Sequence, residues 1–166
     1  MNKINLPDVT LVAVAGVRVP EAYKAIRKSM KGINFGEVKL ITPKNAVTEN
    51  EEVQIIKLDY ELNYEAYNRF IVYNLKDYID TKYVLLVQDD GYVCNPQLWK
   101  DEFYDYDYIG AIWPIPDEND KISYRDPFGR LIRVGNGGFS FRSKKLLNMP
   151  TELDLPWKSY YDHWNE

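Results

Sequence analysis

Two adjacent carboxylates follow directly after the most apolar segment of the chain. The run at residues 83–87, Tyr-Val-Leu-Leu-Val, leads into Gln88-Asp89-Asp90-Gly91. Paired carboxylates can hold a hard divalent cation such as Mg²⁺ or Mn²⁺ through one or two oxygens, and a diphosphate can supply further ligands. An Asp-Asp-Gly turn that is merely solvated explains the same residues equally well when they are taken alone.

A glycine-rich segment, Gly135-Asn136-Gly137-Gly138, is the second candidate for chemistry. It is not a P-loop, because no Gly-Lys-Ser/Thr follows it and a short aromatic strand does. Glycines here would let the backbone approach a ligand closely. A bulged strand that enters the core is the simpler alternative for this segment in isolation.

The elements that must position these residues alternate between strands and helices. Short apolar runs predict strands, and amphipathic spacing with Pro, acidic or Gly boundaries predicts helices. This β-α-β-β-α-β alternation predicts an α/β domain with a mainly parallel sheet, in which ligands bind beyond the carboxyl ends of the strands. The strands are expected at 9–15, 38–42, 53–58, 83–87 (the central strand), 108–112 and 134–141, and the helices from Pro20 to Gly32, at 64–78 and at 143–149.

Composition excludes several classes of protein. The 166 residues suit one domain, and the net charge of −4 without a basic cluster disfavours binding to nucleic acid or an anionic membrane. A single Cys94 and a single His163 leave no disulfide framework, thiolate zinc site or Ser-His-Asp triad. No run approaches the ~18 apolar residues of a membrane span, and the first residues lack the pattern of a signal peptide. We therefore expect a cytoplasmic protein with no membrane span.

Three segments together resemble a family of glycosyltransferase-like domains. They are 79–99, with Val-Gln-Asp-Asp-Gly and Asn-Pro-Gln-Leu-Trp; 106–114, Tyr-Asp-Tyr-Ile-Gly-Ala-Ile-Trp-Pro; and 134–143, Val-Gly-Asn-Gly-Gly-Phe-Ser-Phe-Arg-Ser. The family is similar to the GT-A fold, a nucleotide-binding α/β sandwich that acts on nucleotide-activated sugars. The resemblance runs from about Val9 to the end of the sequence.

The resemblance implies a donor, an acceptor and a metal. The donor would be a nucleoside-diphosphate sugar, with a UDP-sugar favoured, and the acceptor a glycan or another hydroxyl compound. Gln88-Asp89-Asp90 stands where GT-A enzymes carry Asp-x-Asp, so Asp90 is the first candidate ligand for Mn²⁺ or Mg²⁺ and Asp89 the second. Arg69 could face the diphosphate, although a surface salt bridge is the simpler role for a lone arginine. The implied donor-binding residues are Ala15, Gly16, Asp59, Arg69, Asp89, Asp90, Gly137 and Gly138.

The resemblance also implies a carboxylate base near the start of a C-terminal helix. Asn165-Glu166 matches the first two positions of an Asn-Glu-Asp motif, which makes Glu166 the first catalytic candidate and Asp162 a substitute. On this interpretation residues 1–166 form a single GT-A-like domain that lacks its C-terminal segment.

Two other functions remain open. The chain could be a non-catalytic module that binds a nucleotide-sugar or a carbohydrate on the same fold. A nucleotidyltransferase uses a similar platform and carboxylate–metal chemistry, but it usually has a Gly-rich basic loop after the first strand. Residues 16–20, Gly-Val-Arg-Val-Pro, contain one Gly and one Arg, so this alternative ranks lower.

Overall fold

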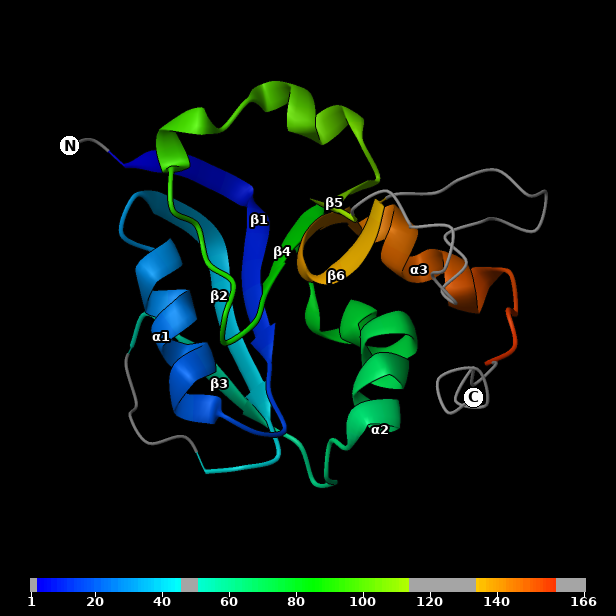
Figure 1. Ribbon diagram of the computed structural model, residues 1–166. Helices are drawn as coiled ribbons and strands as arrows, with labels where there is room; N and C mark the ends of the chain where they lie inside the picture. Colours follow the sequence, from blue (N-terminus) through cyan, green and yellow to red (C-terminus); the bar gives the residue numbers. More distant parts are fainter. Residues whose placement is uncertain (1–2, 46–50, 114–133, 158–166) are drawn as a thin grey trace, which may run out of the picture.

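The computed structural model describes residues 3–45, 51–113 and 134–157. This part of the chain forms one six-stranded sheet with helices on both of its faces (Figure 1). The strands are β1 (Ile4–Val14), β2 (Ile33–Thr42), β3 (Gln54–Lys57), β4 (Tyr83–Val87), β5 (Tyr108–Ile112) and β6 (Val134–Ser143), and the helices are α1 (Val19–Ser29), α2 (Tyr64–Arg69) and α3 (Lys144–Glu152).

The sheet has the order β3-β2-β1-β4-β6-β5. The strands β3, β2, β1 and β4 pair in parallel, whereas β6 pairs antiparallel with both β4 and β5. Among the described strands β6 is therefore alone in running against the others. The predicted α/β class, its mainly parallel sheet and the central place of β4 are confirmed.

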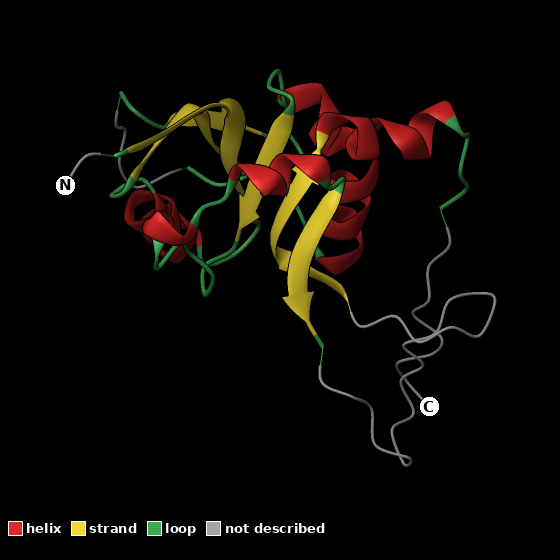
Figure 2. Cartoon of the chain, turned by 90° about the horizontal axis from the view of Figure 1, so that it is seen from above, coloured by secondary structure: helices red, strands yellow, loops and turns green. Residues whose placement is uncertain are grey.

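Alternation along the two central strands divides the core into two layers. Leu11, Ala13 and Val87 pack with α1 on one face, and Val12 and Leu86 pack with the segment that follows α2 on the other. All five side chains are fully inaccessible to solvent. The strands thus separate the helices into two groups (Figure 2), and burial on both faces explains why β1 and β4 read as continuous apolar runs.

The predicted helix at 64–78 changes its winding twice. The α-helix ends at Arg69, a π-helical turn follows at Phe70–Asn74, and a 3₁₀ turn closes the segment at Leu75–Tyr78. The Leu75 N–H donates to the Phe70 carbonyl, which is the five-residue hydrogen bond of a π-helix. Phe70 and Leu75 are both buried in the same layer, so the wider turn places two residues five apart against the sheet.

Other predicted boundaries were too short. β1 begins at Ile4 and β2 at Ile33, five residues before the predicted starts in both cases, and β6 continues to Ser143. Polar residues alternate with apolar ones in the early part of β1, and the β1–β2 register shifts between Leu6 and Thr10. This half of β1 therefore lacks the apolar run that marks the rest of the strand. None of the helices in the described ranges is long and apolar enough to cross a membrane.

Substitution of Leu86 tests the two-layer core. Leu86→Ala should lower the free energy of unfolding by about 2–5 kcal/mol, because a fully buried side chain on a central strand leaves a cavity. Leu98→Ala is the control, since that side chain is 67% exposed and its loss should change stability by less than about 0.5 kcal/mol. Urea denaturation of both variants measures the difference; equal midpoints would contradict the described packing.

Candidate functional site

A cavity of about 380 Å³ opens where β1 and β4 end. The chain leaving β1 forms one wall, the start of α2 a second, and the residues after β4 a third. Three predicted donor-binding residues, Ala15, Gly16 and Asp89, come together here. The lining also includes Leu62, Asn63, Tyr67 and Gln88.

Gly16 allows two chain segments to approach closely. A Cβ atom at position 16 would lie 2.3 Å from the Leu62 carbonyl oxygen and 2.8 Å from the Leu62 Cβ. The Asn63 side chain caps α2 by accepting from the Ala66 N–H at 2.9 Å. The absence of a side chain at Gly16 thus lets the segment before α2 lie against the end of β1. This contact, called the cavity floor below, joins two walls of the cavity.

The two carboxylates occupy the middle of a tight turn. The Gly91 N–H donates to the Gln88 carbonyl at 3.2 Å, and Asp89 and Asp90 lie between them. Phe139 of β6 lies beside Gly91, where an added Cβ would be 3.4 Å from the Phe139 Cβ. The turn is therefore supported by both neighbouring strands, β4 from which it emerges and β6 beside it.

Asp89 is paired with an arginine that the sequence did not single out. Its Oδ2 lies 2.8 Å from Arg18 Nη1, with side-chain exposures of 25% and 65%. Arg18 precedes α1 with φ 51°, a left-handed conformation that costs free energy in a non-glycine residue and that often occurs at functional sites. Because an exposed ion pair contributes about 1 kcal/mol or less, its main effect here is to neutralise the Asp89 charge at the cavity.

Asp90 differs from Asp89 in having no such partner. Its side chain is exposed, and it makes no hydrogen bond or ion pair with the residues that the structure describes. The same residues contain no group of three His, Cys, Asp or Glu side chains that could hold a metal ion. The carboxylates therefore fit a cation that takes one or two protein oxygens and completes its shell with a diphosphate, rather than one enclosed by protein.

Tyr67 provides a neutral hydrogen-bond donor in the cavity wall. Gln88 Nε2 donates to its hydroxyl at 2.8 Å, which leaves the Tyr67 O–H hydrogen available. Burial raises the pKa of Tyr67, and nearby Asp89 adds to this effect, whereas the Gln88 hydrogen bond and the Arg142 charge lower it. The hydroxyl stays protonated at neutral pH.

Arg142 on β6 is a half-buried cation whose charge acts on Tyr67 in this wall. Its Nε donates to Ser140 Oγ at 3.0 Å and its Nη2 to the Gly137 carbonyl at 3.4 Å, and its guanidinium carbon lies 5.4 Å from the centre of the Tyr108 ring. Desolvation lowers the pKa of Arg142, although the charge is retained at neutral pH. A Cβ at Gly137 would lie 2.9 Å from Arg142 Nη2, so Gly137 leaves room for the guanidinium.

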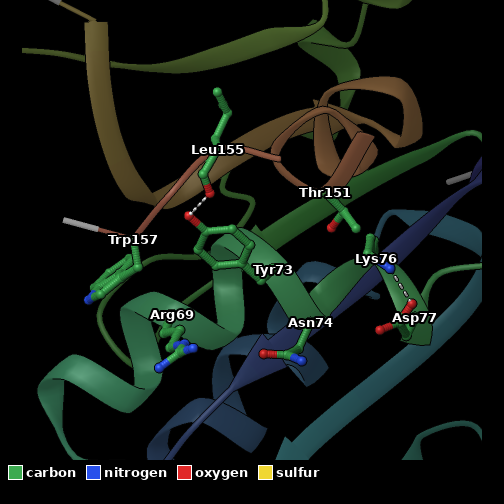
Figure 3. A pocket seen from close by; sticks show the side chains of 8 residues that line it. All are labelled: Arg69, Tyr73, Asn74, Lys76, Asp77, Thr151, Leu155 and Trp157. Atoms are coloured by element: carbon green, nitrogen blue, oxygen red, sulfur yellow. Dashed lines mark hydrogen bonds and ion pairs between the residues drawn. The ribbon is translucent and has the colours of Figure 1, made fainter. Parts of the chain in front are cut away.

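Of the remaining predicted residues, those in the described ranges do not line this cavity: Asp90 follows Asp89 in the turn beside it, and the others lie elsewhere. Gly137 and Gly138 lie on β6, and Asp59 is exposed in the connection after β3. Arg69 lines a second cavity with Tyr73 and other residues (Figure 3). Asp162 and Glu166, the catalytic candidates, lie outside the described residues.

One family model matches most of the chain. The family model described as "Protein of unknown function (DUF5672)" matches residues 50–161. The chain belongs to this family. The matched range includes the Asp89–Asp90 turn, β5, β6 and α3, but β1 and Gly16 precede it.

No curated protein matches the chain. Among solved structures it is similar to 4-diphosphocytidyl-2C-methyl-D-erythritol synthase from Anaerococcus prevotii, with a TM-score of 0.47 and 11% identity over 96% of this chain and 79% of that one.

The close approach at Gly16 yields a test of the cavity floor. Gly16→Ala should lower the free energy of unfolding by about 1–3 kcal/mol, since the new methyl group overlaps the backbone of Leu62. Gly91→Ala is the matched control, because its methyl group would meet Phe139 at an ordinary contact distance of 3.4 Å. Thermal unfolding of the two variants compares them. A Gly16→Ala variant as stable as Gly91→Ala would contradict the close contact.

Proposed function

We propose that this chain binds a nucleoside-diphosphate sugar in the cavity at the ends of β1 and β4 and transfers the sugar to a hydroxyl acceptor. The observation that carries the proposal is the Asp89–Asp90 turn beside this cavity, with Asp89 paired to Arg18 and Asp90 unpaired among the described residues. A UDP-sugar is the favoured donor, and a glycan is the favoured acceptor.

Three parts of the site would contact the nucleotide-sugar donor. The backbone at Ala15 and Gly16 would lie against the nucleotide, as in open α/β sheets whose ligands bind beyond the strand ends. The Tyr67 hydroxyl, neutral at physiological pH, would donate a hydrogen bond to the donor. Arg18 adds positive charge at the rim, where a diphosphate would be attracted.

Asp90 would hold a divalent cation, Mn²⁺ or Mg²⁺, with Asp89 as the second ligand. When bound, such a cation supplies stabilisation of the negative charge that develops on a departing diphosphate. A carboxylate would take the proton of the acceptor hydroxyl. Glu166 and Asp162 stay the predicted candidates for this base. The cytoplasmic location of the protein also stays a prediction.

A binding module without turnover is the second candidate. Among the described residues the only carboxylate that lines the cavity is Asp89, and its charge is already paired with Arg18. Its Oδ2 is already engaged by the arginine at 2.8 Å, so this oxygen is not available to an acceptor hydroxyl. This observation favours a site that binds a nucleotide-sugar without activating an acceptor.

Calorimetric titration with UDP and UDP-glucose, with and without Mn²⁺, tests the shared binding step. We expect the metal and the nucleotide to raise each other's affinity by about 5–150-fold, because the cation is shared between Asp90 and the diphosphate. Asp90→Asn should remove this coupling. Asp105→Asn, which changes another exposed carboxylate on the connection before β5, should leave it intact.

The outcomes separate the candidates. Failure of every nucleotide and nucleotide-sugar to bind the wild-type chain would overturn the proposal. Binding combined with sugar transfer that is lost in Glu166→Gln or Asp162→Asn supports a transferase. Binding without transfer or hydrolysis supports the module.

A further inference from the structure

A second cavity, of about 440 Å³, lies between the π-helical turn after α2 and the end of α3 (Figure 3). Its volume falls in the range of about 300–1,000 Å³ that is usual for small-molecule sites. It shares no lining residue with the cavity at the ends of β1 and β4. The residues that matter for its chemistry are Arg69, Tyr73, Asn74, Thr151 and Trp157.

Two aromatic rings in this cavity are held by separate hydrogen bonds. The Tyr73 hydroxyl donates to the Leu155 carbonyl at 2.8 Å, and the Trp157 indole N–H donates to Glu65 Oε1 at 3.3 Å. The ring centres are 6.1 Å apart at an interplanar angle of 70°. Because both polar ends are already engaged, the rings offer mainly their apolar surfaces to a ligand.

Three polar groups around the rings are not engaged. The Arg69 guanidinium, the Asn74 amide and the Thr151 hydroxyl make no hydrogen bond or ion pair with any residue in the described ranges. Lys76 and Asp77 also line the cavity, but they pair with each other at 2.7 Å. Arg69 therefore supplies the unbalanced positive charge of this lining.

The combination restricts the class of ligand. Aliphatic lipid would leave the amide, hydroxyl and guanidinium without partners, which costs free energy wherever they are desolvated. A bare metal ion finds no group of three ligating side chains in the described part of the chain. A saccharide has an apolar face for an aromatic ring and hydroxyl groups for amide and hydroxyl partners, and a sugar carboxylate matches the two-pronged geometry of a guanidinium.

We propose that this cavity binds an acidic saccharide, with a sugar carboxylate on Arg69 and a sugar face against Trp157. Arg69 and Trp157 line the same cavity, and Figure 3 shows the Arg69 side chain below the Trp157 and Tyr73 rings in this view. Since the two cavities share no residue, the proposal does not rest on the proposed transfer of a nucleotide-bound sugar.

Titration with trigalacturonic acid and with neutral maltotriose tests this site. Calorimetry and tryptophan fluorescence measure the binding of each ligand. We expect wild-type protein to bind the acidic trisaccharide about tenfold more tightly than the neutral one, the size expected for a charge-assisted hydrogen bond. Arg69→Gln should remove that preference, and Trp157→Ala should weaken both ligands. Saturating UDP should leave both affinities unchanged.

Arg27→Gln is the matched control, because Arg27 lies on α1 away from this cavity, with its side chain 41% exposed and paired with Glu52. This variant should bind both trisaccharides like the wild type. Arg69 is exposed and Trp157 is only half-buried, so both variants should keep the wild-type thermal unfolding curve. The proposal is overturned if the wild type binds neither ligand at millimolar concentration, or binds both with equal affinity. It is also overturned if Arg27→Gln lowers the affinity for the acidic trisaccharide as much as Arg69→Gln does.

Discussion

The parallel pairing of β1 with β4 is the constraint on which the candidate site depends. The last paired residues are Ala13 and Val87, and both strands are buried on both faces. A shift of one residue would turn every apolar side chain of a strand to the other face, so burial fixes the register closely. Because the strands run in the same direction, their exits at Ala15 and Asp89 emerge at one edge and line one cavity.

A buried polar network fixes the opposite, amino-terminal part of the same pair. Thr10 of β1 is fully buried, donates to Glu37 Oε2 at 3.0 Å, and shares a 2.7 Å hydrogen bond with Thr81. Lys39 of β2 is 5% exposed, lies 2.9 Å from Glu37, and donates to the Tyr78 carbonyl at 2.7 Å. Buried charges of this kind add little net stability but penalise other arrangements, since a slipped strand would leave them unpaired. The network therefore links strand register to the end of the segment that follows α2.

The sequence predicted the sheet well because burial on two faces leaves an unmistakable pattern. The run in β4 was located to the residue, and the carboxyl-terminal half of β1 was placed correctly. The edge strand β5 was also located to the residue, although its residues are half-buried or exposed. The π-helical turn was missed because Phe70, Ile71 and Leu75 also satisfy the spacing of an ordinary helix. Only the backbone hydrogen bond from Leu75 to Phe70 distinguishes the two.

Only part of the predicted set of site residues lines the cavity, and the long-range contacts around it leave little local signal in the sequence. Ala15, Gly16 and Asp89 were expected at the nucleotide end of the sheet, and they line one cavity. Arg18 was read only as a weak version of a basic loop, because neither its left-handed backbone nor its contact with Asp89 is visible in the sequence. Arg142 falls between the predicted strand at 134–141 and the predicted helix at 143–149, and the sequence did not single it out.

Asp89 and Asp90 differ in their availability to a cation, because only Asp89 is already paired within the described part of the protein. Gln88 donates its amide to Tyr67, and Asp89 is paired with Arg18, so both residues are committed to holding the cavity wall together. If Asp89 became a cation ligand, Arg18 would lose its partner while keeping a strained backbone, so that exchange is unfavourable unless the diphosphate replaces the carboxylate. Asp90 has no such cost among the described residues. Asp90 is therefore the first ligand for a cation, and Asp89 becomes the second only when a diphosphate takes its place on Arg18. Cation binding at this turn then depends on the nucleotide.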